Sequence, residues 1–135
     1  MDYRIPLVFC IAFIIAINAP TMVSGQSKDS LLYLLNNDLV KDDAEKYELL
    51  CRIASNSTDA DSILKYSEQA LKLAEELNIL PVQPIVYKGI GYLNSGKLAS
   101  ALECFMKAAN YYKKDHNNKG LATVYLYMLQ TYKDI

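Results

Sequence analysis

The chain has 135 residues and a formal net charge of −1, with 14 Lys and Arg residues against 15 Asp and Glu residues. This length suits one small domain, and the balanced charge lacks the basic excess with which nucleic-acid-binding proteins neutralise phosphates. Hydrophobic residues make up 52% of the chain, too many for a disordered polymer. We therefore expect one folded domain that does not bind nucleic acid.

The N-terminus carries the pattern of an export signal. Arg4 precedes a nearly uncharged apolar run from Ile5 to Ala19, and small residues lead up to Gly25. We predict a signal peptide over residues 1–25, cleaved after Gly25, and export to the periplasm. The run is shorter than the roughly 20 residues of a spanning helix. An uncleaved inner-membrane anchor over residues 5–19 stays open, so we expect membrane contact only if this segment is retained.

The remainder of the chain alternates between amphipathic stretches and short polar turns, which predicts helices. Asp42 and Asp59 stand where helix N-caps are expected, and Gly96 stands where a helix-ending glycine is expected. No stretch alternates strictly between apolar and polar residues, so we predict an all-α fold without a sheet. The predicted helices lie near residues 31–35, 42–54, 60–77, 82–95, 98–114 and 121–135, with a polar connector over residues 115–120.

Small and apolar positions recur along these helices with a period of 38 to 40 residues. Adding 38 to the numbers of Cys51, Ala54, Ile63, Ser67 and Ala70 gives Gly89, Tyr92, Ala101, Phe105 and Ala108. Adding 40 to the first two of these gives Leu129 and Tyr132. A fixed period of this length indicates an array of stacked helix pairs.

The unit from Gly89 to Ala108 resembles the tetratricopeptide repeat, on the spacing of its signature packing residues Gly89, Tyr92, Gly96, Ala101, Phe105 and Ala108. The resemblance implies antiparallel helix pairs stacked as a short right-handed α-solenoid. Gly89 and Ala101 would then let two helices approach closely, while Tyr92 and Phe105 fill the wider gaps. The implied organisation is a capping helix in residues 26–40 and repeats over residues 41–135, with units near 42–80 and 82–116 and an incomplete unit at 119–135.

The sequence departs from that family's pattern at Ile85 and Lys88, where tryptophan and leucine are usual, and in a period longer than the family's usual one. The first unit is similar to exported repeat segments of Bacteroidota, which often precede sensor kinases, cyclases or transcription regulators. The resemblance implies an exported protein- or peptide-binding module. The alternative is the sensory N-terminal part of a membrane-bound signalling protein whose output domain lies outside this chain.

No combination of residues predicts an enzyme, a cofactor or a metal site. His116, the one histidine, lies in a polar connector without a second ligand nearby. Asp59 and Asp61 flank a helix start, where capping explains them better than acid–base chemistry. Cys51 and Cys104 are expected to be buried free thiols.

The family's geometry implies a ligand groove lined by the first helix of each unit. The implied partner-binding residues are Glu48, Arg52, Gln83, Val86, Ile90, Asn94, Leu126 and Gln130, with Glu45 and Lys133 at the two ends. An interpretation of these residues as ordinary solvated surface stays equally open.

The last predicted helix carries an apolar face that lacks a covering helix, formed by Leu121, Tyr125, Met128, Leu129 and Tyr132. Repeat arrays usually end in a helix with a polar outer face. We therefore expect the chain to be the front part of a longer repeat protein, or to self-associate through this helix.

Overall fold

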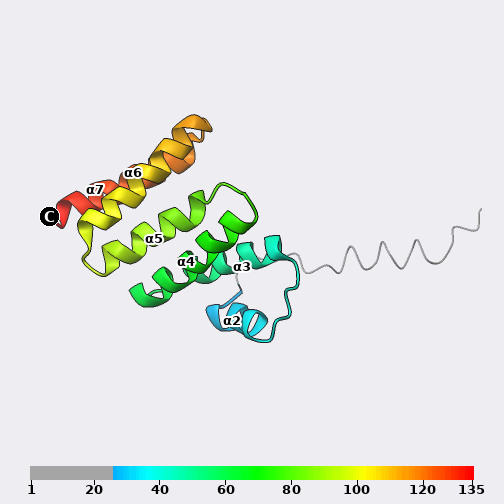
Figure 1. Cartoon of the computed structure of the whole chain (residues 1–135). Helices are drawn as coiled ribbons and strands as arrows, with labels where there is room; N and C mark the ends of the chain where they lie inside the picture. The colour runs from blue at the N-terminus through cyan, green and yellow to red at the C-terminus, as the bar shows by residue number, and fades with distance from the viewer. Residues whose placement is uncertain (1–25) are drawn as a thin grey trace, which may run out of the picture.

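The computed structural model describes residues 26–135, and within that range the fold is entirely helical, as the sequence predicts. Its six helices run back and forth, each packed against its neighbour in sequence (Figure 1). The helices are α2 (Lys28–Asn36), α3 (Asp43–Ser55), α4 (Ala60–Glu76), α5 (Val82–Asn94), α6 (Leu98–Lys114) and α7 (Asn118–Lys133). The predicted signal peptide and anchor lie outside the described residues.

Short polar side chains fix the starts of four helices. Asp42 accepts a hydrogen bond from the backbone N–H of Glu45 at 2.9 Å, and Asp59 accepts one from the N–H of Ser62 at 2.7 Å. The capping role predicted for both aspartates is therefore confirmed. Ser27 caps α2 in the same way, and Asn117 caps α7. Each cap satisfies a backbone donor that the first helical turn leaves unpaired.

Four helices end in the same motif, with one residue in the left-handed conformation. These residues are Asp38, Asn78, Gly96 and His116, whose φ angles lie between 49° and 73°. After each, the next N–H donates to a carbonyl five residues earlier, as from Lys97 to Tyr92 at 2.9 Å. This is the Schellman motif, for which glycine is the usual residue. The prediction that Gly96 ends a helix is confirmed, and His116 has a local structural role as well as an exposed side chain.

The last helix begins three residues earlier than the sequence predicts, at Asn118 and not near Leu121. The predicted connector ended at Gly120, but Asn117 caps the helix by accepting the N–H of Gly120 at 2.9 Å. Gly120 is therefore a helical residue. A Cβ atom there would lie 2.5 Å from a carbon of the Tyr112 ring, so the glycine lets α6 and α7 meet closely.

The interior consists of two apolar clusters arranged along the chain. One joins α2, α3 and α4 around Leu49, Ile53 and Ala70, all fully buried. The other joins α5, α6 and α7 around Phe105 and Val124. Helix α3 also contacts α5, and α5 contacts α7, whereas α4 and α6 make no such contact among the described residues.

Four of the six residues predicted as packing positions are buried, whereas Tyr92 is half-buried and Gly96 is exposed in the turn after α5, with nothing within 4 Å of an added Cβ. Ala101, Phe105 and Ala108 are fully buried. A Cβ atom on Gly89 would lie 2.6 Å from Phe105 Cε1, which confirms that this glycine permits the close approach of α5 and α6. Gly91 likewise permits the close approach of α5 and α4, because a Cβ there would lie 2.8 Å from Leu64 Cγ.

Candidate functional site

The candidate groove residues of α3 lie on one side of that helix. Glu45, Glu48 and Arg52 are spaced by three and four residues, which places them on one face. Both glutamates are exposed and Arg52 is half-buried, while Tyr47 and Cys51 point into the core. The helix is thus divided between a packing face and a charged face.

A pocket of about 930 Å³ opens beside this charged face of α3. Its apolar lining comes from α3 itself, the end of α2, the connector between α2 and α3, and the connector after α4. The lining residues are Gln26, Leu34, Leu39, Val40, Ala44, Glu45, Tyr47, Glu48, Arg52 and Ile79. We call this cavity the α3 pocket. Its size and its apolar walls with a few charged groups are typical of ligand sites.

The apolar walls of the α3 pocket were not predicted as functional residues. Leu39 and Ile79 follow the left-handed residues Asp38 and Asn78, at the position where a Schellman motif usually carries an apolar residue. Both are exposed, at 55% and 41%. The equivalent spacing of two apolar residues in two connectors, 40 residues apart, was the signal in the sequence.

The candidate residues of α5 contribute less surface than the sequence suggested. Gln83 and Asn94 are exposed at the two ends of the helix, and Ile90 is half-buried. Val86 is only 7% exposed, because it lies in the cluster around Phe105, and it offers almost no surface to a partner. None of these four residues lines the α3 pocket.

The candidate residues of α7, Leu126, Gln130 and Lys133, are all exposed. They also lie away from the α3 pocket, so the pocket brings together only the predicted residues of α3. Of the three, only Leu126 belongs to the separate apolar surface of α7.

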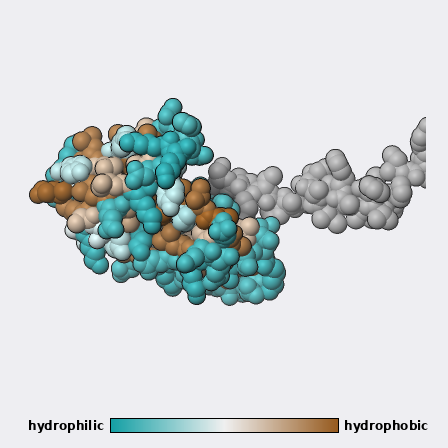
Figure 2. Space-filling view, turned by 45° about the horizontal axis from the view of Figure 1, so that its top comes forward, coloured by the Kyte–Doolittle hydropathy of each residue, from teal (hydrophilic) through white to brown (hydrophobic). Residues whose placement is uncertain are grey.

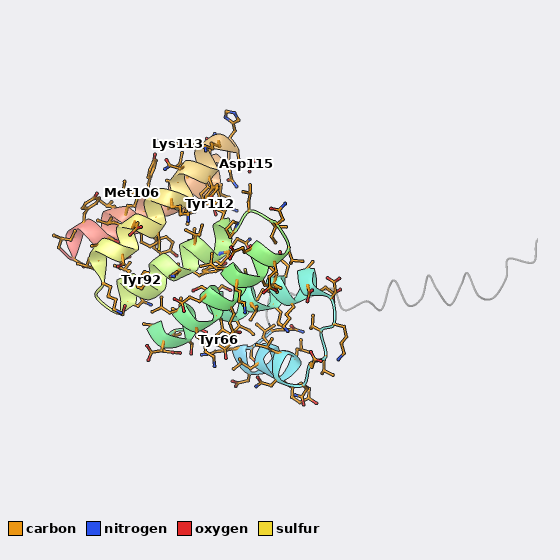
Figure 3. All side chains as sticks on the ribbon, viewed as in Figure 1. Tyr66, Tyr92, Met106, Tyr112, Lys113 and Asp115 are labelled. Carbon is orange, nitrogen blue, oxygen red and sulfur yellow. The ribbon has the colours of Figure 1, made fainter. Side chains whose placement is uncertain are left out.

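A smaller cavity of about 250 Å³ lies between α4, α5 and α6, where Lys88 and Cys104 are half-buried. Lys88 forms an ion pair with Glu68 at 3.3 Å and lies over the Tyr92 ring, 5.7 Å from its centroid; Tyr92 is labelled in Figure 3. Burial lowers the pKa of Lys88, but the hydrogen bond to Glu68 and the neighbouring tyrosine outweigh it and raise the pKa overall. Lys88 is therefore held as a cation and is not a base.

The two thiols are free and neither is activated. Burial raises the pKa of Cys51 to about 12, and it also raises the pKa of Cys104. A nucleophilic cysteine needs a lowered pKa. Cys51 is buried as predicted, whereas Cys104 is half-buried, because the α6 face that carries it lines the smaller cavity.

The described range, residues 26–135, holds no group of three or more His, Cys, Asp or Glu side chains placed to share a metal ion. It likewise holds no helix whose length and apolar character would let it cross a membrane.

No protein-family model matches the chain, and neither a curated protein nor a solved structure gives a significant match.

Proposed function

We propose that this chain is a protein- or peptide-binding module built from tetratricopeptide-like helix pairs in a short right-handed solenoid. The contacts of α3 with α5 and of α5 with α7 support this arrangement, because first helices meet on the inner side of such an array. The left-handed residues Asp38, Asn78 and His116 recur at intervals of 40 and 38 residues, which supports the repeat.

The observation that carries the proposal is the α3 pocket. Its apolar walls suit one or two apolar side chains of a peptide, and Glu45 and Glu48 at its rim suit a cationic neighbour. Arg52 adds a positive group deeper on the same face, where a peptide carbonyl or carboxylate would be recognised. A peptide that combines apolar and basic residues is therefore the proposed ligand class, and no catalytic step is involved.

The experiment selects binders from a library of displayed random peptides, using the full chain as bait, and then measures the affinity of selected synthetic peptides. Leu39→Asp is the test variant, because Leu39 is 55% exposed and lines the pocket. Leu80→Asp is the matched control, since Leu80 is 71% exposed and is not part of the pocket. Neither change opens the core, so both variants should fold.

We expect Leu39→Asp to weaken peptide binding at least about tenfold and Leu80→Asp to leave it unchanged, since about 1.4 kcal/mol of lost apolar contact is tenfold in affinity. The variant Glu48→Lys should bind basic peptides more weakly than the parent does. The variant Ile90→Ala separates a ligand that continues along α5 from one confined to the pocket, because Ile90 does not line the pocket whereas Arg52 does. Equal binding by the parent and Leu39→Asp would refute the pocket as the ligand site.

We also propose that the module is exported and that residues 1–25 are removed. Arg4 and the apolar run of residues 5–19 support an export signal. Mass spectrometry of the chain purified from expressing cells tests the proposal directly. A mature chain that begins at Gln26 is the expected result, and a full-length chain in the membrane fraction would favour the anchor.

A further inference from the structure

Helix α7 exposes a continuous apolar face. Tyr125, Leu126, Leu129 and Tyr132 are 45%, 67%, 54% and 57% exposed, respectively. Ile135, just beyond the helix, is 76% exposed. In Figure 2, hydrophobic residues reach the surface at the left-hand end of the molecule, the end at which Figure 1 places the C-terminus. Scattered exposed apolar residues are ordinary, but a contiguous face marks an interaction site.

The internal repeat shows what this face does in the two earlier helix pairs. The equivalent residues are Tyr47, Cys51 and Ala54 in α3; Ile85, Gly89 and Tyr92 in α5; and Tyr125, Leu129 and Tyr132 in α7. The three residues of α3 are at most 7% exposed, because α4 packs with them in the first cluster. In α5, the glycine and Ile85 are buried against α6. The face of α7 is thus built to receive a helix.

The same face also restricts the chemistry of its occupant. Between Lys119 and Lys133, α7 has no charged residue, whereas α4 and α6 carry charged residues along their outer sides. The helix most similar in this respect is α5, whose one charged residue is Lys88 and which is covered by α4 on one side and α6 on the other. An occupant of the α7 face must therefore present an apolar helical face, and α7 itself carries such a face.

We propose that the α7 face binds the α7 face of a second copy of this chain, with the two helices antiparallel about a twofold axis. Leu126 and Leu129 lie three residues apart near the middle of the helix, so a twofold axis places Leu126 of one copy against Leu129 of the other. The tyrosines lie at the edges of the contact, where their rings are covered and their hydroxyl groups stay in water.

The available area agrees with a dimer of modest affinity. A tyrosine buries roughly 200 Å² when fully covered, so each half-exposed residue contributes about 100 Å². Five such residues give each copy roughly 500 Å², and the two copies together about 1,000 Å², which is the minimum for a biological interface and lies in the range of weak association. Leu129 occupies the position of Gly89, so the two α7 helices meet at a wider spacing than α5 and α6.

The experiment is sedimentation equilibrium of the full chain from about 1 µM to about 1 mM, a range that covers weak association. The test variant is Leu129→Glu, and the control is Leu80→Glu, an exposed leucine outside α7. We expect the parent and the control to approach twice the chain mass with rising concentration, and Leu129→Glu to weaken association at least tenfold. The parent, Leu129→Glu and Leu80→Glu have the same N-terminal residues. A difference in association between them is therefore due to the change in α7.

A photo-crosslinking amino acid at position 126 gives an independent readout that does not depend on tolerance of a buried charge. We expect intermolecular cross-links to map to residues 125–132 of the second copy. A monomer throughout the concentration range, a dimer unaffected by Leu129→Glu, or cross-links confined to another segment would each overturn the proposal. The peptide pocket on α3 is unaffected by any of these outcomes, since it lies on another part of the molecule.

Discussion

The ring of Phe105 stacks on the ring of Tyr127, with centroids 5.4 Å apart and planes 11° from parallel. The Phe105 ring also fills the space that a Cβ on Gly89 would occupy, so it joins α5, α6 and α7. It is fully buried, and its neighbours on both sides hold it in place. The packing of the C-terminal half of the molecule therefore depends on one aromatic ring that fits between a glycine and a tyrosine.

Replacing Gly89 with alanine should destabilise the protein, although alanine is the better helix former. The added Cβ would lie 2.6 Å from Phe105 Cε1 and 3.1 Å from Cys104 Cβ, and the stacked ring cannot move away freely. Overpacking typically costs about 1–3 kcal/mol, which exceeds the gain of about 1 kcal/mol in helix propensity. Urea unfolding followed by circular dichroism measures the difference.

The matched double variant Gly89→Ala, Phe105→Leu identifies the clash as the cause. Leucine removes the ring edge that meets the new methyl group, so the two changes together should cost less than the sum of the single changes. Additive losses would show that Gly89→Ala acts through something other than Phe105.

The left-handed residues predict opposite effects for two substitutions at equivalent positions. Gly96→Ala should destabilise the protein by about 1–2 kcal/mol, because an L side chain at φ 73° is strained even though no atom lies within 4 Å of the new Cβ. His116→Gly should stabilise it, because φ at His116 is already 53° and glycine adopts this conformation without strain. Thermal unfolding of both variants checks the pair, and destabilisation by His116→Gly would mean that the imidazole has a stabilising contact.

All six helix starts can be predicted from the sequence to within three residues, because polar caps and apolar periodicity act locally. The largest differences are at α2 and α7, which each begin three residues earlier than predicted. At α7 the reason is Gly120, which has the character of a connector residue in the sequence but packs against the Tyr112 ring in the fold. The candidate site was predicted only in part. Glu48 and Arg52 come from the groove geometry that the tetratricopeptide resemblance implies, but the pocket beside them depends on Leu39 and Ile79, which two separate connectors bring together.

The two thiols should differ in reactivity and in their response to pH. Cys51 is buried with a pKa of about 12, so it should resist alkylation in the folded protein at pH 8, whereas half-buried Cys104 should react first. Iodoacetamide labelling followed by mass spectrometry of the two peptides measures this order. Faster labelling of Cys51 than of Cys104 in the folded protein would contradict the described burial.

The same raised pKa predicts a loss of stability in alkali. A thiol ionises near pH 8.5 in the unfolded chain but near 12 in the fold, so the folded state holds its proton more tightly. The stability that the protonated Cys51 thiol contributes to the fold is complete below about pH 8.5 and is lost as the pH rises from there toward 12. Burial raises the pKa of Tyr47 beside it as well, which adds to the loss above about pH 10. Urea midpoints measured from pH 7 to 10.5 should fall progressively, and a flat profile would contradict the assignment.

Acid should destabilise the protein at the junction of α2 and α4. There Asp59 accepts hydrogen bonds, and Lys28 Nζ lies 3.2 Å from the Asp59 carboxylate. The Ser62 hydroxyl and backbone N–H, together with Lys28, hold the pKa of Asp59 below its usual value. Because the pKa is lowered, the stability that the Asp59 carboxylate contributes is complete above about pH 4, the pKa of aspartate in an unfolded chain. This stability is lost as the pH falls below that value.

Asp59→Asn isolates this effect, because asparagine remains a good N-cap but cannot titrate. The parent should be more stable than Asp59→Asn at pH 7, and the difference should shrink as the pH falls from 4 to 2. Asp61→Asn, in the same helical turn, is the control and should leave the acid profile of the parent unchanged. Lys28→Met should remove part of the difference at pH 7, more at low than at high salt, because surface ion pairs are screened. A pH-independent gap between the parent and Asp59→Asn would show that the carboxylate's charge contributes nothing to this junction.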